Sequence, residues 1–299
     1  MYETDDIPAV SATAVSHRYG RRDALRDISF RLPAGGVVGL VGANGSGKST
    51  LLRIIAGVTR PSSGSLSISG TDLASNESSG AGVGAAIDGM SLWPGWTVER
   101  NLRYLCGLAG IAPTKIGEVA RMTGLTRELR TKLRRLSLGN RQRVSIAAAA
   151  LCGTRLVLLD EPMNGLDPDA RRQTRDLITT LAREGRTVVF SSHDLHDVET
   201  VCRDLIVLES GRLVFSGALE DYAEQMMVVA LVIVEHDAGR AAAALTGAQL
   251  RWWADRSGRP VVALDDADEA ERVLTAADVL LQRSEWRPAT LEERFDERR

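Results

Sequence analysis

The sequence predicts an α/β fold built on a mainly parallel sheet, followed by a small α+β region. Short apolar runs, VVGLVG (37–42) and TRLVLLD (154–160), have the composition of strands that are buried on both faces. Segments with helical spacing of apolar residues separate such runs, and strands that alternate with helices form parallel sheets. After about residue 217 the chain changes to MMVVALVIVEH and an alanine-rich segment, which indicates a second, smaller region.

The predicted elements follow one another along the chain. VSATAVSHRY, ALRDISFRL and VVGLVG alternate or remain apolar and predict strands. KSTLLRIIAG, from Lys48, has helical spacing and stops at Gly57, and SGSLSISG returns to a strand. Helical patterns dominate residues 97–150. DARRQTRDLITTLAREG predicts a helix that begins after Pro168 and ends at Gly185, and TVVF and DLIVL predict two more buried strands.

The last part of the chain predicts a small α+β accessory domain over residues 221–299. Its segments MMVVALVIVEH, RWWADRSGRPVVAL and DEAERVLTAADVLL have the patterns of short strands and a helix. Trp252, Trp253 and Trp286 are expected to form its core, and a dimer contact or a regulatory role is the alternative.

Composition and charge argue against several classes of protein. With 299 residues, 44% hydrophobic and 25% charged, the chain has the composition of a globular protein with an ample core. The net charge is only −2 and charges of both signs are scattered, so a one-signed surface for nucleic acid is not expected. The acidic N-terminus, the lack of an apolar run of about 18 residues and three widely separated cysteines predict a cytoplasmic chain without a membrane span or export signal.

The clearest chemical signal is GANGSGKS (42–49), which matches the phosphate-binding pattern G-x-x-x-x-G-K-S/T between a strand and a helix. Glycines let backbone amides converge on phosphate oxygens, and the helix N-terminus adds a positive potential. Lys48 supplies a cation for the β and γ phosphates, and the hydroxyl of Ser49 is a ligand for Mg²⁺. A chance glycine turn is the alternative. The candidate nucleotide-binding residues are Gly42, Asn44, Gly45, Gly47, Lys48, Ser49 and Thr50.

A site that hydrolyses nucleotides also needs carboxylates near the phosphates. The buried run LVLLDE ends in Asp160 and Glu161, downstream of the phosphate loop. We expect Asp160 to hold Mg²⁺ and Glu161 to act as the general base that polarises the attacking water. Taken alone, an apolar run that ends in two acidic residues fits a strand followed by a turn equally well.

Further segments resemble the nucleotide-binding subunit of ATP-binding cassette (ABC) transporters. LSLGNRQRVSIAAAAL (136–151) is similar to the LSGGQ signature segment of that family and keeps its serine and second glycine as Ser137 and Gly139. NGLD, in DEPMNGLDP, resembles the loop that links the two active sites, and SSHDLHDVE places His193 at the switch-histidine position. Order and spacing agree over roughly residues 10 to 220.

The resemblance implies a P-loop NTPase core with an antiparallel β subdomain and a helical subdomain at about residues 89–150. It implies an ABC ATPase domain over residues 1–220, ahead of the accessory domain. It also implies that two cassettes bind ATP between them head to tail, with Ser137 and Gly139 contacting the γ-phosphate from the opposite subunit. A chain with a single cassette is therefore expected to work as a dimer with itself.

The same resemblance suggests roles for two further residues. Tyr19, in SHRYG, matches the aromatic residue that stacks on adenine, although an aromatic residue at a strand end is the alternative. His193 is expected to contact the γ-phosphate and to orient the water or Glu161. The other histidines lack a partner pattern and are predicted to lie at the surface; they are His17, His196 and His236.

The chain departs from the family pattern at Leu138 and Asn140 of the signature, and more strongly at Asp88. Family members usually carry at that position a glutamine that senses Mg²⁺ and the γ-phosphate. IDGMSLWPGWTVERNL resembles the acidic variant of bacterial drug and bacteriocin export cassettes, so Asp88 is a candidate sensing residue of the catalytic site. A simple Asp-Gly turn is the alternative. Trp93 and Trp96 are either core anchors or a contact for the membrane partner.

These features predict an ATPase subunit that hydrolyses ATP with Mg²⁺ and works as a homodimer. It is expected to drive export of a drug-like, antibiotic or peptide substrate through separately encoded transmembrane permease subunits. Its predicted location is cytoplasmic and peripheral, on the inner face of the cell membrane, with no nucleic-acid partner. An ABC importer ATPase is the first alternative, and a non-transport ABC ATPase of the soluble kind is the second.

Overall fold

The computed structural model describes residues 7–73, 82–87, 92–224, 227–234, 237–255, 257–290 and 293. Asp88 lies outside the described residues, as does His236. The chain divides into two compact units, Met1–Gly217 and Ala218–Arg299, and each is considered by itself.

The first unit contains an antiparallel sheet with strands in the order β2-β1-β4-β5. These strands are β1 (Val10–Tyr19), β2 (Arg22–Leu32), β4 (Ser63–Ile68) and β5 (Thr71–Asp72). Val10 of β1 lies opposite Leu32 of β2 and Ile68 of β4, and all three side chains are buried. The alternation of apolar and polar residues in the sequence therefore gives this sheet one face that packs on the core.

The second sheet of this unit is mainly parallel, with described strands in the order β10-β9-β3-β8-β7-β6. Its strands are β3 (Gly36–Val41), β6 (Val83–Ala86), β7 (Leu156–Leu159), β8 (Thr187–Ser192), β9 (Asp204–Glu209) and β10 (Arg212–Ala218). The pairs β6/β7, β7/β8, β8/β3 and β3/β9 are parallel. Every residue of β7 and β8 is buried, which explains why these strands are continuous apolar runs in the sequence.

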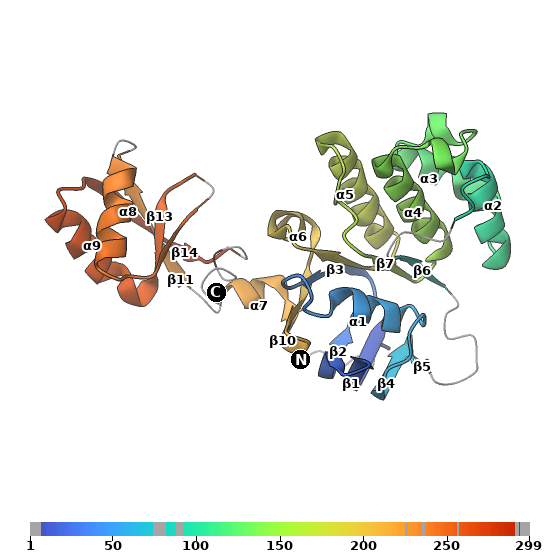
Figure 1. Ribbon diagram of the computed structural model, residues 1–299, viewed down its shortest axis with the longest axis horizontal. Coiled ribbons are helices and arrows are strands. Elements are labelled where there is room, and N and C mark those ends of the chain that lie inside the picture. The colour runs from blue at the N-terminus through green and yellow to red at the C-terminus, as the bar shows by residue number, and fades with distance from the viewer. Residues whose placement is uncertain are drawn as a thin grey trace. The chain divides into compact units, whose positions relative to one another are not determined.

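Helices cover both faces of the parallel sheet (Figure 1). On one face α1 (Lys48–Ile55) lies next to β1 and β2, and its leucines and isoleucines join a buried cluster with residues of both sheets. On the other face lie α4 (Leu138–Cys152), α5 (Pro168–Arg183) and α6 (Leu195–Val201). The predicted α/β class with a parallel sheet and an antiparallel subdomain is thus confirmed.

The helices that directly precede α4 in the chain form a helical subdomain, which also contains the start of α4. Its other helices are α2 (Val98–Leu108), α3 (Ile116–Met122) and the 3-10 turns η1 (Pro113–Lys115), η2 (Thr126–Glu128) and η3 (Leu133–Arg135). Thr97 caps α2 because its hydroxyl accepts a hydrogen bond from the amide of Arg100 at 3.2 Å. The segment before α2 is held to the segment around η3 by an isolated bridge between Thr97 and Lys132.

The second unit is α+β, as the sequence predicts. Its antiparallel sheet has the described order β12-β13-β11-β14. The strands are β11 (Met227–Ile233), β12 (Trp252–Ala254), β13 (Pro260–Ala263) and β14 (Leu281–Pro288), and the helices are α7 (Leu219–Glu224), α8 (Ala238–Gly247) and α9 (Ala267–Ala276).

Both faces of this sheet carry buried apolar residues. The half-buried Trp252 packs against the cluster formed with α8 and α9, and its neighbour Trp253 packs against a smaller cluster around Val228 and Val261. Successive residues of a strand point to opposite faces, so the two tryptophans serve two different cores. The side chain of Trp286 lies outside the described part of the chain.

The prediction for one histidine is wrong. His17 is only 8% exposed, because it lies on the face of β1 that packs on the core. Its ring contacts the ring of Tyr19 edge to face, with centroids 4.6 Å apart. The strand alternation that buries Val15 places His17 on the same face, and this alternation was a better guide than residue type. His196 is exposed, as predicted.

Candidate functional site

The polar residues singled out in the sequence follow three adjacent parallel strands. The phosphate loop follows β3, Asp160 and Glu161 follow β7, and His193 follows β8. In the register, Leu159 pairs with Phe190 of β8, and Leu40 of β3 pairs with Ser191. The carboxyl ends of neighbouring parallel strands meet at one edge of the sheet, which is where open α/β folds bind ligands.

The phosphate loop needs glycine for both conformation and space. Gly42 has φ 153° and Gly47 has φ 109°, in the region that side chains disfavour. A Cβ atom at Gly42 would lie 2.2 Å from the carbonyl oxygen of Leu208, and one at Gly47 would lie 2.6 Å from a methyl group of Leu25. Any larger residue at either position would clash with these atoms and force the backbone of the loop to move. Asn44 and Gly45, at the tip of the loop, are exposed.

Lys48 begins α1 and is buried within the loop, with 6% of its surface exposed. Its ammonium donates hydrogen bonds to the carbonyl oxygens of Gly42 at 2.7 Å and Ala43 at 3.2 Å. Burial lowers the pKa of Lys48, while the negative charges of Glu161 and Asp160 act in the opposite direction. A phosphate group would relieve the desolvation of this cation, so the loop favours an anionic ligand. Its neighbours Ser49 and Thr50 are half-buried and buried.

Ser191 connects the carboxylate of Asp160 to the backbone of Glu161. Its hydroxyl donates a hydrogen bond to Oδ1 of Asp160 at 2.5 Å and accepts one from the amide of Glu161 at 2.8 Å. Ser191 is fully buried, so this hydroxyl has a fixed place between the strands. Glu161 has φ 47°, a left-handed conformation that costs a residue other than glycine about 1 kcal/mol or more. The strand ends thus hold Glu161 in an unfavourable backbone conformation.

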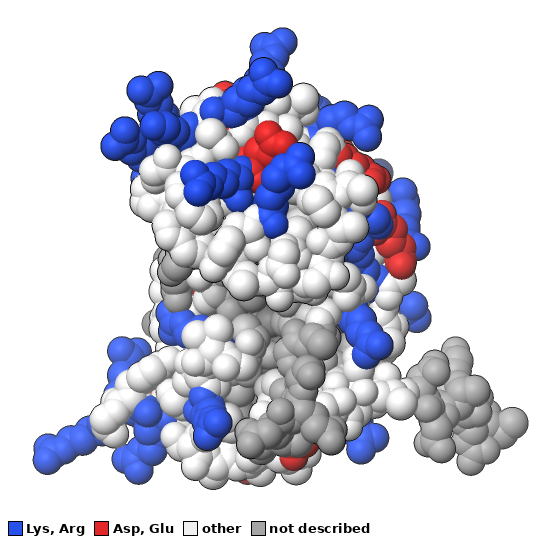
Figure 2. Space-filling model, turned by 90° about the vertical axis from the view of Figure 1, so that its right-hand side faces the viewer, with Lys and Arg blue, Asp and Glu red and all other residues white. Residues whose placement is uncertain are grey.

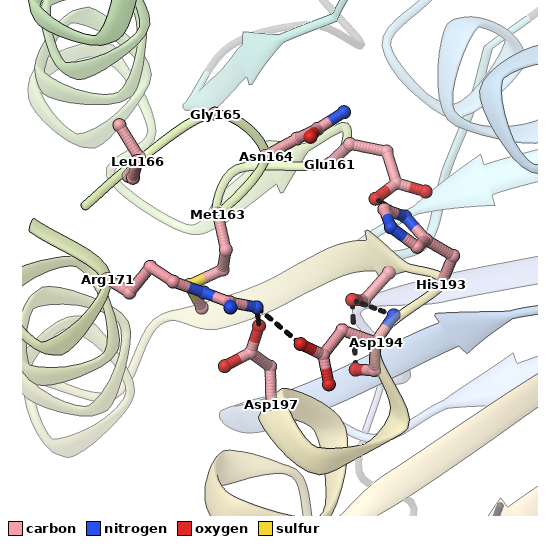
Figure 3. Close-up of a pocket in the computed structure, with 10 residues that line it drawn as sticks. Glu161, Met163, Asn164, Gly165, Leu166, Arg171, His193, Asp194 and Asp197 are labelled. Carbon is pink, nitrogen blue, oxygen red and sulfur yellow. Dashed lines mark hydrogen bonds and ion pairs between the residues drawn. The ribbon is translucent and has the colours of Figure 1, made fainter. Parts of the chain in front are cut away.

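Glu161 and His193 are in direct contact. Oε2 of Glu161 lies 2.7 Å from Nδ1 of His193, and the two side chains are 25% and 59% exposed. Figure 3 shows the imidazole ring directed toward the carboxylate, from the segment that follows β8. A carboxylate with an adjacent imidazole and access to solvent has the geometry of a general base with an orienting partner.

A network of charges lies beside this pair and lines the same open pocket (Figure 3). Arg171 of α5 donates hydrogen bonds to Asp194 at 2.5 Å and to Asp197 at 2.7 Å. Burial by itself raises the pKa of Asp194, but the hydrogen bond and charge of Arg171 outweigh it and lower that pKa overall. Asp194 also caps α6 by accepting from the amide of His196. Arg171 therefore ties the segment that carries His193 to α5.

The signature residues lie at the start of α4. Ser137 is the N-cap and accepts a hydrogen bond from the amide of Asn140 at 3.2 Å. Ser137 is exposed and Leu138 is 78% exposed. Gly139 faces the loop after β7, since a Cβ atom there would lie 3.5 Å from the carbonyl oxygen of Gly165. This helix N-terminus has unsatisfied amides and a positive potential at an exposed surface.

Tyr19 is 47% exposed at the end of β1. The ring of His17 contacts the ring of Tyr19 edge to face. The hydroxyl of Tyr19 lies 3.5 Å from a guanidinium nitrogen of Arg53 on α1. An exposed aromatic ring beside the helix that follows the phosphate loop has the position needed to stack on a base.

Oxygen donors suited to Mg²⁺ follow β3 and β7. Ser49 supplies a hydroxyl and Asp160 a carboxylate, and Ser191 binds one oxygen of Asp160, which orients the other. Hydroxyl, carboxylate and phosphate oxygens are the ligands that Mg²⁺ prefers, so the donor set fits this ion.

The sequence patterns did not identify Ser191, Arg171, Asp194 or Gln142. Nε2 of Gln142, on α4, lies 3.4 Å from the carbonyl oxygen of Glu161, a long hydrogen bond between the signature helix and the carboxylate segment. The available signal was the pair of serines that ends the apolar run TVVFSS, because polar residues at the end of a buried strand often lie at a site. Arg171 gave no such signal, since its partners lie more than twenty residues away in the sequence.

Comparisons with known proteins agree with this geometry. The family model described as ABC transporter matches residues 25–164. The Bacillus subtilis protein described as uncharacterized ABC transporter ATP-binding protein YdbJ is 37% identical, over 69% of this chain and 68% of its own length. The Nod factor export ATP-binding protein I of Rhizobium etli is 30% identical, over 74% of this chain and 72% of its own length.

An import protein and a solved structure are also similar. The methionine import ATP-binding protein MetN of Caulobacter vibrioides is 35% identical, over 69% of this chain and 65% of its own length. The solved structure described as the ATP binding subunit of an ABC transporter is 29% identical, with a TM-score of 0.67, and the match covers 73% of this chain and 92% of that chain.

The fold and the site define a P-loop ATPase with a signature helix. The chain belongs to the family of ABC transporter ATP-binding proteins. Such subunits bind and hydrolyse ATP, and the chain is accordingly an ATPase. Among the described helices, none is both long and apolar enough to span a membrane, and members of this family work with transmembrane subunits.

Proposed function

We propose that this chain is the ATPase subunit of an exporter that moves a drug-like, antibiotic or peptide substrate through separately encoded permease subunits. The observation that carries the ATPase part is the contact of Glu161 with His193, next to the phosphate loop on the adjacent strand. Export is supported by the resemblance of the Asp88 segment to export cassettes. Similar proteins include a Nod factor export ATP-binding protein, whose name supports export, and a linearmycin resistance ATP-binding protein, whose name supports a drug-like or antibiotic substrate.

In this proposal each residue of the site has a separate task. Lys48 and the amides of the loop that contains Gly42, Gly45 and Gly47 bind the phosphates, and Asn44 and Thr50 complete the loop. Ser49 and Asp160 hold Mg²⁺, which, when bound, neutralises charge that develops on the phosphate oxygens. Tyr19 stacks on the adenine ring.

Glu161 is the proposed general base for the attacking water. Its carboxylate takes the proton, and the neighbouring His193 orients either the carboxylate or the water. Asp160, held by Ser191, stays oriented during this step. Asp88 lies outside the described residues, and we propose that it senses the bound nucleotide in place of the more usual glutamine.

We further propose that two copies of the chain bind ATP head to tail. The exposed start of α4, with Ser137 and Gly139, is an anion-binding helix terminus that meets no phosphate loop within its own compact part of the described chain. Placed against the loop of a second copy, it would contribute a hydroxyl and amides to the γ-phosphate. The proposed location is cytoplasmic, on the inner face of the cell membrane.

A mixing experiment tests both the site and its assembly. Lys48→Ala and Ser137→Ala each inactivate one half of every site, so each variant alone should lose ATP turnover. In a mixture, a heterodimer would contain one site with both halves intact, and turnover should return to a sizeable fraction of the wild-type rate. If mixing restores nothing while each variant still binds the other, the head-to-tail arrangement is wrong.

The direction of transport requires its own experiment. Import is the second candidate, because the methionine import protein MetN is 35% identical to this chain. The chain should copurify with a membrane protein of about six apolar spans, and the reconstituted complex should move substrate away from the face on which ATP is hydrolysed. Dependence on an external substrate-binding protein, with movement toward the ATPase, would instead establish import.

A further inference from the structure

The phosphate loop lies in a part of the chain that carries an excess of positive charge. Residues 7–73 contain eight Lys and Arg residues and three Asp and Glu residues, a net charge of +5. Residues 92–152 contain eleven and three, a net charge of +8, whereas the whole chain has −2. The expectation that charges are scattered is therefore wrong for both regions. Figure 2 views the side of the first unit on which β4, β5 and α2 lie, and shows Lys and Arg side chains over this face with few Asp and Glu between them. Such a surface attracts anionic ligands.

The beginning of β2 packs directly against the phosphate loop. A Cβ atom at Gly47 would lie 2.8 Å from the carbonyl oxygen of Ala24. The backbone of Gly211, between β9 and β10, joins the two segments. Its amide donates to the carbonyl oxygen of Ser46 at 3.0 Å, and its carbonyl oxygen accepts from the amide of Arg26 at 2.7 Å. These backbone contacts fix the position of β2 relative to the loop.

Arg22, the first residue of β2, reaches the tip of the phosphate loop. One of its guanidinium nitrogens lies 3.4 Å from the position that a Cβ atom at Gly45 would occupy. Gly45 has φ 81°, and both residues are exposed. The guanidinium therefore lies beside the loop backbone at a place that a ligand can reach from solvent.

Arg22 is also the strand partner of Tyr19. The two-residue turn of Gly20 and Arg21 joins β1 to β2, and Gly20 has φ 60° at the position where such turns often carry glycine. Residues directly opposite each other in an antiparallel pair have their side chains on the same face of the sheet. Arg22 thus extends from beside Tyr19 to the tip of the loop.

The charge of Arg22 is not neutralised in the way that its neighbours are. Arg18 lies 2.8 Å from a carboxylate oxygen of Asp23, and Arg26 lies 3.5 Å from the other oxygen. No carboxylate among the described residues forms an ion pair with Arg22. An exposed guanidinium beside a phosphate-binding loop is therefore available to an anionic ligand of that loop.

We propose that Arg22 is a second cation of the nucleotide site and binds phosphate oxygens of the bound ATP. Lys48 occupies the inside of the loop, where its ammonium donates to the carbonyl oxygens of Gly42 and Ala43. Arg22 instead meets the loop at its exposed tip, next to Tyr19. A nucleotide with its base on Tyr19 and its phosphates in the loop would pass this guanidinium. The inference rests on the proposed function, because it takes the loop as the phosphate site and Tyr19 as the base contact.

A guanidinium supplies something that the ammonium of Lys48 does not. It is planar, stays charged and presents a fork of N–H donors that matches two phosphate oxygens. Because Arg22 is exposed, water and salt weaken its attraction to an anion. Its removal should therefore weaken nucleotide binding by about tenfold rather than abolish it.

Two probes separate the phosphates from the base in calorimetric titrations of the full chain with Mg²⁺. One is a non-hydrolysable analogue of ATP, and the other is tripolyphosphate, which has no base. Arg22→Gln should weaken both by about tenfold, and Arg22→Lys, which keeps the charge but not the fork, by about threefold. Tyr19→Ala should weaken the ATP analogue only. The matched control, Arg21→Gln, removes the same charge from the adjacent exposed residue and should bind both probes like wild type.

Several results would overturn the inference. An unchanged affinity of Arg22→Gln for tripolyphosphate would exclude a phosphate contact, and a loss confined to the ATP analogue would place Arg22 on the base or the ribose. An equal loss in Arg21→Gln would indicate a general effect of charge on the hairpin. A loss of dimerisation with ATP, without a change in tripolyphosphate affinity, would assign Arg22 to a contact with a second copy of the chain.

Lys48→Ala separates this inference from the proposed function. If that variant still binds tripolyphosphate like wild type, the loop is not the phosphate site and the proposed function fails. If Lys48→Ala loses tripolyphosphate while Arg22→Gln retains it, only the role of Arg22 is wrong. The melting temperatures of the Arg22 and Arg21 variants without nucleotide should equal that of wild type, since both side chains are exposed, so a lower affinity would not reflect unfolding.

Discussion

The carboxylate edge of the parallel sheet and the start of α4 differ in how far their polar side chains are buried and hydrogen-bonded to other parts of the chain. At the sheet edge, Ser191 is fully buried and binds both Asp160 and the Glu161 backbone, and Glu161 contacts His193. At the start of α4, Ser137 and Leu138 are exposed and the only side-chain bond of Ser137 in the described residues is its cap. Folding alone gives the sheet edge its internal contacts, whereas the start of α4 remains exposed, as our proposal of a head-to-tail pair of chains requires.

The largest expected effect is at the assembled half. Glu161→Gln removes the proposed base but keeps the side-chain volume, and should lower ATP turnover by about a thousandfold. ATP should then accumulate between two copies, which light scattering with size exclusion would detect as a dimer. Glu209→Gln, at an exposed strand end, is the matched control and should turn over normally. Normal turnover by the Glu161 variant would refute the assignment of the base.

A smaller loss is expected at Ser191. Ser191→Ala leaves Asp160 without its buried donor and the Glu161 amide without its acceptor, so kcat should fall by about tenfold. Ser191→Thr keeps the hydroxyl and should recover most of the rate. The apparent affinity for Mg²⁺ should weaken in the Ala variant, since Asp160 is no longer oriented. A drop of the same size in both variants would point to packing rather than to the hydroxyl.

The charge network beside the site should show a dependence on pH. Burial raises the pKa of Asp194, but Arg171 outweighs it and lowers that pKa below its ordinary value, so their contact stabilises the fold above about pH 4 and is lost as pH falls through the lowered pKa. Arg171→Gln should therefore lower the melting temperature at pH 7, and the difference from wild type should shrink in acid. Arg172→Gln, whose partner Asp169 is exposed, should have little effect at either pH.

The smallest effect on turnover is expected in the second unit. Glu293 is 3% exposed and accepts from Arg287 at 2.6 and 2.7 Å, and breaking a buried pair costs about 3 kcal/mol. Glu293→Gln should lower the melting transition of this unit, as followed by calorimetry, while ATP turnover stays near wild type. A large loss of turnover at temperatures where both units are folded would show that the second unit takes part in the ATPase cycle.

Much of the fold and half of the site could be predicted because the signals are local. The glycines and Lys48 of the phosphate loop are adjacent in the sequence, and the runs before Asp160 and His193 are strands buried on both faces. The serine pair that ends TVVFSS was a weak signal for Ser191, and Arg171 gave none. Their partners are brought together only by the order β3-β8-β7 and by the packing of α5.

The charge distribution was missed for a different reason. The net charge of −2 is a sum that includes residues 92–152, in and around the helical subdomain, at +8. It also includes the second unit, Ala218–Arg299, with ten basic and seventeen acidic residues, at −7. A sum over the chain hides regions of opposite sign. His17 was misjudged in a similar way, because residue type was weighed without the alternation of its strand.

The left-handed backbone at Glu161 sets turnover against folding stability. A glycine adopts φ 47° without a Cβ clash, so Glu161→Gly should relieve about 1 kcal/mol of strain and offset part of its own entropic cost. The same change deletes the carboxylate that faces His193. The gain in stability would therefore be small, whereas the loss of the proposed base would be complete, so the strained backbone is the cost of placing a carboxylate in front of His193.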